Sequence, residues 1–140
     1  MEDGSCFART DEAPHEAALA PGVRSIAGLD PDAGLKHLRG RSESYMRLLK
    51  RFAETRADEV DAMRTHLAAR SYDELASVVH NVKGVAGFLG AAAIHGLAME
   101  TATALRRSCG HGEIERLAEA LMAAQLKLAE DVLALDGKTS

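Results

Sequence analysis

Residues 71–90, SYDELASVVHNVKGVAGFLG, decide the fold of this chain. The stretch begins with Ser71-x-x-Glu74, the form of a capping box, which marks the start of a helix. Apolar side chains then recur every three or four residues, as in a helix with one buried face. Gly90 ends the pattern, since glycine is common just after a helix. The stretch predicts a helix whose apolar positions are Leu75, Val78, Val79, Val82, Ala86 and Leu89.

The remainder of the chain predicts further helices. Asp30 is a good N-cap and Pro31 suits the first helical position, so we expect a short helix over residues 31–39. Three longer segments show the apolar spacing of amphipathic helices: residues 42–67, as one bent helix or as two joined closely, residues 91–108 and residues 113–135. Short connections between long helices predict antiparallel neighbours. We therefore expect an all-α fold, an antiparallel four-helix bundle with one or more short N-terminal helices.

Composition agrees with helices and with a single domain. The chain has 140 residues, 46% of them hydrophobic, with three Pro and no Trp. This length supports one domain with a modest core, and the abundance of alanine and leucine favours helices. Residues 1–28 mix Gly, Pro, Ala and charges without periodicity, so we expect a flexible tail or linker there. We expect residues 29–136 to form the bundle domain.

The composition also disfavours several kinds of partner and site. A net charge of −4 argues against nucleic-acid binding. The longest weakly polar run, residues 84–94, is too short and too rich in glycine to span a bilayer. No signal peptide is visible, so we expect a cytoplasmic protein with no membrane contact. The His and Cys residues show no metal-binding spacing, and no ATP-binding signature of a kinase is present.

His80 stands on a different face of the predicted helix from the apolar stripe. At about 100° per residue, it falls about 140° away from Leu75. Lys83 lies one turn on, where its ammonium can reach an anion on the ring. A neutral imidazole is a usable nucleophile near physiological pH. A nucleophile, a cation and an open approach therefore coincide, as a phosphohistidine requires. The small residues that open the approach are Ala76, Gly84 and Gly87.

Each of these residues also has a purely structural interpretation. A single exposed histidine on a helix is usually ordinary surface, and Lys83 could be an ordinary solvated charge. Gly84 and Gly87 could mark a place where two helices pack closely. Their coincidence on one face raises the odds of a functional site, but the residues alone leave both interpretations open.

The pattern H-x-x-K-G, read from His80 to Gly84, resembles the histidine phosphotransfer (HPt) domain of bacterial two-component phosphorelays. Residues 80–91 resemble the central segment of that family almost throughout. The resemblance covers about residues 28–135. Its other matching positions are Gly28-Leu29-Asp30, Gly34-Leu35, Tyr45, Leu48, Leu49, Phe52, Ile94 and Leu105.

The resemblance implies a role for His80. Its Nε2 atom would accept a phosphoryl group from an aspartate of one receiver domain and pass it to an aspartate of a second. Lys83 would help to neutralise the phosphoryl group. The receivers would belong to response regulators or hybrid histidine kinases and would carry the Mg²⁺, so this chain would need no cofactor or metal. We expect a monomeric phosphocarrier rather than an enzyme. The docking residues of this phosphocarrier would include Ala76, Gly84, Gly87 and Phe88.

The sequence departs from the family pattern at one position. Many members carry Gln or Glu twenty-two residues after the histidine, where it bonds Nδ1 of the ring and fixes the tautomer. That position is Ala102 here. Arg106, one turn further on, is a candidate for assisting the phosphate or the docking of the receiver.

Two other functions stay open. The chain could be the phosphotransfer domain of a larger hybrid sensor kinase or chemotaxis-type kinase. It could instead be a bundle that docks receivers without transferring phosphate, or one that is wholly structural. Because this sequence lacks an ATP-binding signature, we expect no autophosphorylation in either case.

Overall fold

The computed structural model describes residues 19–139, with side chains through Leu135. In this range the chain is helical and has no strand, which confirms the all-α prediction. A short 3-10 turn precedes five α-helices: η1 (Val23–Ser25), α3 (Pro31–His37), α4 (Ser42–Ala68), α5 (Tyr72–Leu89), α6 (Ala92–Arg106) and α7 (His111–Thr139).

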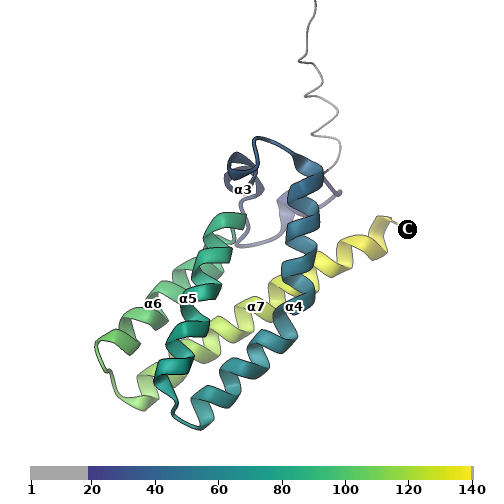
Figure 1. Ribbon diagram of the computed structural model, residues 1–140. Helices are drawn as coiled ribbons and strands as arrows, with labels where there is room; N and C mark the ends of the chain where they lie inside the picture. The colour runs from purple at the N-terminus through teal and green to yellow at the C-terminus, as the bar shows by residue number, and fades with distance from the viewer. Residues whose placement is uncertain (1–18, 140) are drawn as a thin grey trace, which may run out of the picture.

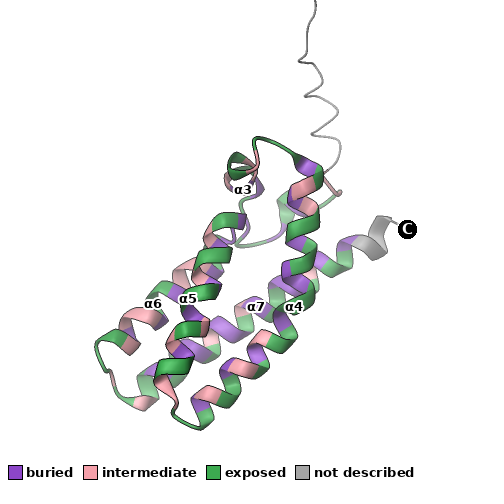
Figure 2. Ribbon diagram, viewed as in Figure 1, coloured by how far each residue is buried: buried purple, intermediate pink, exposed green. Residues whose placement is uncertain are grey.

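The four long helices, α4 to α7, lie side by side (Figure 1). Helix α4 packs against α5 and α7, and α6 packs against the same two helices. The turns that join these helices contain only two to four residues, which keeps consecutive helices adjacent. Buried residues recur along each of the four helices, between exposed ones (Figure 2). The short helix α3 contacts α4 and α5 and lies at the end of α5 that leads into α6 (Figure 1).

Helix α5 follows the sequence prediction closely. All but one of its six predicted apolar positions are buried, and Val78 is half-buried. Gly90 is the C-cap and adopts the left-handed conformation, with φ of 81°. Ser71 is the N-cap, but its side chain makes no capping hydrogen bond. The capping-box pattern therefore locates the helix start correctly, while the side-chain bond that it implies is absent.

The other long helices differ from their predicted bounds by a few residues. Helix α4 is one continuous helix, which decides between the two alternatives left open for residues 42–67. Helix α6 ends at Arg106, and α7 begins at His111, each two residues before its predicted position. None of the described helices is long and apolar enough to cross a membrane.

The prediction of a tail over residues 1–28 is wrong for residues 19–28. Val23 is 1% exposed and Ile26 is 8% exposed, and both join the core together with Leu29. The segment folds as a short 3-10 turn, so its apolar residues are too few to give a helical period. Residues 1–18, the rest of the predicted tail, lie outside the described residues.

Candidate functional site

His80 lies on the exposed face of α5. It borders a shallow hollow of about 420 Å³. Within the described part of the chain, the imidazole forms no hydrogen bond and no ion pair. A molecule that reaches this face therefore meets a ring whose two nitrogens have no partner from the described residues. The other residues that line the hollow are Asn81, Gly84, Val85 and Phe88.

Gly84 has no structural reason to be a glycine. A Cβ atom built at this position meets no heavy atom within 4 Å. The residue sits in the interior of α5 at a helical φ, where glycine costs about 1 kcal/mol relative to alanine. Close helix packing, the structural alternative raised above, therefore does not account for Gly84. The open space faces the same hollow as His80.

Gly87 differs from Gly84, because helix packing accounts for it. A Cβ atom on Gly87 would lie 3.1 Å from Nδ1 of His95, on α6. The His95 ring is half-buried, with Nδ1 3.1 Å from the carbonyl oxygen of Lys83. We expected the bare backbone of Gly87 to give clearance to a partner. The structure instead explains this glycine by close packing between α5 and α6.

Lys83 lies one helical turn after His80 and is half-buried. Residues three apart on a helix are surface neighbours, with Cβ atoms about 5–6 Å apart. Its ammonium forms no ion pair with any side chain in the described range. The charge is therefore available to an anion held near the His80 ring.

Ala102 lies opposite His80 on α6. The tight turn at Gly90 makes α5 and α6 neighbours that run in opposite directions, and Gly87 faces His95 across them. His80 lies seven residues before Gly87 on α5, and Ala102 lies seven residues after His95 on α6. Because both helices rise equally per residue, His80 and Ala102 are level with each other. The methyl group of Ala102 cannot hydrogen-bond the ring. On this count, the position facing His80 offers no hydrogen-bond partner to Nδ1.

The neighbours of Ala102 do not replace the missing group. The hydroxyl of Thr101 is buried and donates to the carbonyl oxygen of Leu97 at 2.7 Å. Nη2 of Arg106 donates to the hydroxyl of Thr103 at 3.4 Å. Arg106 is exposed and lies one turn from Ala102, with no contact to His80 among those described.

We expect Ala102→Gln to change the tautomer of His80. The new carboxamide oxygen would accept a hydrogen bond from Nδ1–H, and a net gain of about 1 kcal/mol shifts the tautomer ratio about fivefold toward the Nδ1–H form. Ring ¹⁵N chemical shifts, recorded at a pH where the imidazole is neutral, measure this ratio. Ala102→Leu is the matched control, with similar bulk and no acceptor. If Ala102→Gln and Ala102→Leu have the same tautomer ratio, position 102 does not face the His80 ring.

Three successive carbonyl groups at the end of α5 are each capped from another segment. Nδ1 of His37 lies 2.9 Å from the oxygen of Phe88, and the Tyr45 hydroxyl donates to the oxygen of Leu89 at 2.8 Å. The Asp30 amide donates to the oxygen of Gly90 at 2.7 Å. Orphan carbonyls at a helix end need such partners. The caps therefore fix the end of α5 that carries Phe88.

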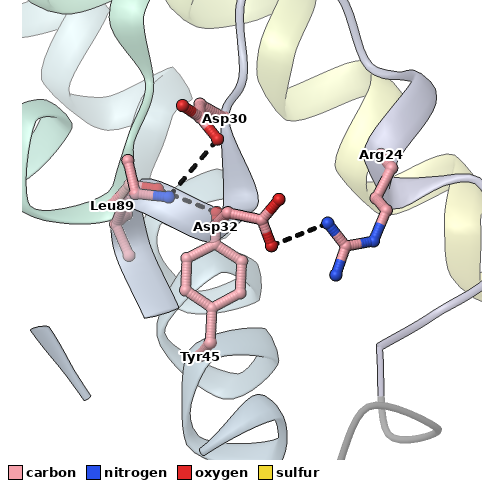
Figure 3. A network of polar contacts seen from close by, with 6 residues as sticks. Arg24, Asp30, Asp32, Tyr45 and Leu89 are labelled. Carbon is pink, nitrogen blue, oxygen red and sulfur yellow. Dashed lines mark hydrogen bonds and ion pairs between the residues drawn. The ribbon is translucent and has the colours of Figure 1, made fainter. Parts of the chain in front are cut away.

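Tyr45 is held between polar groups (Figure 3). Burial, reinforced by the carboxylates of Asp30 and Asp32, raises the pKa of Tyr45, so its hydroxyl stays protonated and remains a donor. Figure 3 shows its ring directed toward Leu89, with the ion pair of Asp32 and Arg24 beside it; these two side chains are 2.7 Å apart. This polar corner joins α3 and α4 to the end of α5.

Phe88 lies at this capped end of α5, and its side chain is part of the protein surface. It is 40% exposed, and its ring stacks on that of His37 with centroids 4.9 Å apart. Of the predicted docking residues, Gly84 and Phe88 line the hollow beside His80. Ala76 is half-buried and Gly87 packs against His95, and neither lines that hollow.

The sequence interpretation missed two residues of the hollow, Asn81 and Val85. Val85 is 44% exposed, which is unusual for a valine in a long helix. Both lie off the apolar stripe on the helical wheel that located His80, so the same wheel could have found them. In the described part of the chain, no group of three or more His, Cys, Asp or Glu side chains is placed to hold a metal ion.

The chain is similar to proteins of one known family. The family model of the Hpt domain matches residues 47–136. Among solved structures, the chain is similar to the HPt domain from the Hpt sensor hybrid histidine kinase from Shewanella. The TM-score is 0.71 at 19% sequence identity, and the match covers 81% of this chain and 97% of that one. No match was found among curated proteins.

Proposed function

The chain belongs to the Hpt domain family, whose members carry out histidine phosphotransfer in phosphorelays and interact with receiver domains, and we propose that His80 is its phosphoryl carrier. The Nε2 lone pair attacks the phosphorus of a receiver's aspartyl phosphate. A P–N bond forms, the P–O bond to the aspartate breaks, and the receiver recovers its carboxylate. Transfer to a second receiver reverses these bond changes. The Nδ1–H proton stays on the ring or leaves to solvent as the charge on the ring requires.

The observation that carries this proposal is the open space beside Gly84. A glycine in the middle of a helix weakens that helix, and nothing inside the described protein requires one there. The space lies in the hollow next to a histidine whose ring is unpartnered within the described residues. Clearance for a docked protein explains both features at once.

The charged side chains have supporting roles in this proposal. Lys83 neutralises part of the charge on the phosphoryl group, and Arg106 assists the phosphate or the docked receiver. Phosphoryl transfer depends largely on positioning and on stabilisation of charge. The Mg²⁺ belongs to the receiver, so the chain needs no cofactor of its own. It acts as a phosphocarrier rather than an enzyme.

The finer features of the architecture are also proposals. Helices α4 to α7 constitute an antiparallel four-helix bundle, and the domain begins before residue 29, because Val23 and Ile26 are part of the core. We propose that it works as a monomer in the cytoplasm. The docking surface comprises the hollow beside His80, with Gly84 and Phe88 as its central contacts.

We expect Gly84→Leu to block docking without unfolding the protein. A leucine projects into the open space and covers the approach to His80, while helix propensity improves. The expected result is a fall of about tenfold or more in kcat/KM for transfer from a phosphorylated receiver, the size of effect that one lost contact of about 1.4 kcal/mol gives. Radiolabel transfer measures the rate, and thermal unfolding measures stability.

Gly96→Leu is the control for that substitution. Gly96 lies on α6, and a Cβ atom there also meets nothing within 4 Å. This variant should transfer phosphate at the parent rate. If Gly84→Leu transfers phosphate as fast as the parent, Gly84 does not provide clearance for the docked receiver.

A second candidate function is phosphotransfer within a larger hybrid sensor kinase. The solved structure that the chain resembles comes from such a kinase and spans an HPt domain alone. Incubation of this chain with ATP should give no label in either case. Transfer from an isolated receiver to this chain supports the phosphorelay function in both settings.

A further inference from the structure

A second hollow adjoins the one that contains His80. It lies between α4 and α5 and has a volume of about 280 Å³. Three exposed apolar side chains border it: Leu48, Val85 and Phe88, at 39%, 44% and 40% exposure. Val85 and Phe88 also line the His80 hollow, so the two form one continuous surface. We call the second hollow the α4–α5 groove.

A receiver that docks over His80 must cover this groove. Phe88 lies eight residues after His80, which is about 12 Å along the helix. A specific interface of ordinary size covers about 800 Å² on each partner, and a disc of that area centred on His80 has a radius of about 16 Å, which exceeds this distance. The groove therefore belongs to the contact area of any partner whose aspartate reaches the ring.

The groove contains a buried cation, Arg56. This side chain is only 7% exposed. Its Nε donates to the oxygen of Phe52 at 2.9 Å, Nη1 to Oε1 of Gln125 at 2.8 Å, and Nη2 to the hydroxyl of Thr55 at 2.9 Å. Every one of these acceptors is neutral. Since guanidinium has five N–H groups, two of them remain without an assigned acceptor.

No carboxylate among the described side chains forms an ion pair with Arg56, and the nearby charge of Glu59 offsets only part of the effect of burial on the Arg56 pKa. Burial lowers the pKa of Arg56, but arginine stays charged in proteins. A buried charge without an ion-pair partner is costly. A carboxylate placed in the groove would remove that cost.

Arg51 adds a second cation at the same groove. It lines the groove from α4, is exposed, and forms no ion pair in the described part of the structure. Residues 36–56 together carry seven Lys or Arg and two Glu, a net charge of +5 in a chain whose total is −4. Such an asymmetry steers an acidic partner surface toward this end of the molecule.

We propose that the α4–α5 groove selects receivers that present a carboxylate beside an apolar side chain. The apolar group packs on Val85 and Phe88, and the carboxylate pairs with Arg51 and the free N–H groups of Arg56. This inference rests on the proposed function, because it assumes that a receiver docks over His80. It adds the chemistry by which one receiver is preferred to another.

Phosphotransfer kinetics test the proposal with the receiver that donates phosphate fastest in a panel of purified receivers from the same genome. Arg51→Glu should lower kcat/KM about tenfold or more at 150 mM salt, since it places a like charge against the carboxylate. The rate at saturating receiver should stay within about twofold, because the chemistry at His80 is untouched. Arg56→Gln should show the same pattern, provided that its thermal unfolding matches the parent.

Arg47→Glu is the matched control. It makes the same change of charge one turn earlier on α4, but Arg47 lines the hollow toward α7 instead of the groove. Its kcat/KM should fall much less than that of Arg51→Glu, because Arg47 lines the other hollow and makes no direct contact with a carboxylate held in the groove. An effect as large as that of Arg51→Glu, or no effect of Arg51→Glu, would overturn the proposal.

A binding measurement separates this proposal from the proposed function. 3-Phenylpropionate carries a carboxylate beside an apolar ring, and 3-phenylpropionamide is its neutral counterpart. In titrations followed by amide NMR shifts of Thr55, Val85 and Phe88, the carboxylate should bind several-fold more tightly, and Arg51→Glu should abolish the difference. Equal affinity of the two probes would contradict the groove chemistry, whether or not His80 carries phosphate. A dimer that Arg51→Glu dissociates would assign the groove to a second copy of the chain instead.

Discussion

The variant His80→Gln is expected to accept no phosphoryl group from any receiver. Glutamine fills similar space but has no ring nitrogen with a nucleophilic lone pair, so the P–N bond cannot form. Because His80 is exposed and unpartnered in the described structure, the substitution should change the free energy of unfolding by no more than about 0.5 kcal/mol. Incubation with a radiolabelled phosphoreceiver, followed by a test for acid-labile and base-stable label, measures the transfer.

His95→Gln is the control for this result. His95 lies on α6, and its ring packs against Gly87 of α5. This variant should still become labelled, with a lower stability if the contact to the Lys83 carbonyl is lost. Label retained in His80→Gln, or lost only in His95→Gln, would show that the acceptor is misassigned.

The largest effect on stability is expected from Gly90→Ala. Gly90 has φ of 81°, a conformation that alanine adopts only at a cost. In addition, a Cβ atom there would overlap the carbonyl oxygen of Asp30 and would lie 3.2 Å from the amide nitrogen of Gly34. Both neighbours are backbone atoms, so neither can rotate away. We expect a loss of about 3 kcal/mol or more in the free energy of unfolding, from the strain and the overlap together.

Chemical denaturation of Gly90→Ala measures this loss, and Gly96→Ala provides the comparison. Gly96 lies inside α6 with open space around it, so alanine there should stabilise the protein by about 0.5–1 kcal/mol. The Gly90 variant should also weaken the bond from the Asp30 amide to the Gly90 carbonyl, which ties α3 to the end of α5. An unfolding midpoint equal to that of the parent would show that this corner does not hold α5 in place.

The parts of the fold that long periodic segments encode could be predicted from the sequence. The apolar stripe of α5 and its end at Gly90 are examples, because many residues contribute to the same pattern. The segment that contains Val23 and Ile26 could not be recognised, since one short turn gives no period and only the tertiary contacts bury these residues. Arg56 was also missed, because its burial depends on a partner, Gln125, which lies far away in the sequence.

The candidate site was predictable where one helix determines it. The wheel of α5 placed His80 outside the core and beside Gly84, and the structure brings both to one hollow. The wheel could not distinguish Gly84 from Gly87, because the contact of Gly87 with His95 depends on how closely α6 approaches. The α4–α5 groove was not predicted for the same reason. Its lining depends on which face of α4 meets α5, and a single helical pattern does not contain that information.

The position of the phosphorus atom tests the central claim most directly. The chain is labelled with ¹⁵N in its histidine rings, phosphorylated by a receiver, and observed by NMR through ³¹P–¹⁵N coupling. We predict one coupled ring nitrogen, Nε2 of His80, with the other histidines unchanged. Phosphorus coupled to another histidine, or bound to an oxygen with no coupling to nitrogen, would contradict the assignment of His80 as the phosphoryl carrier.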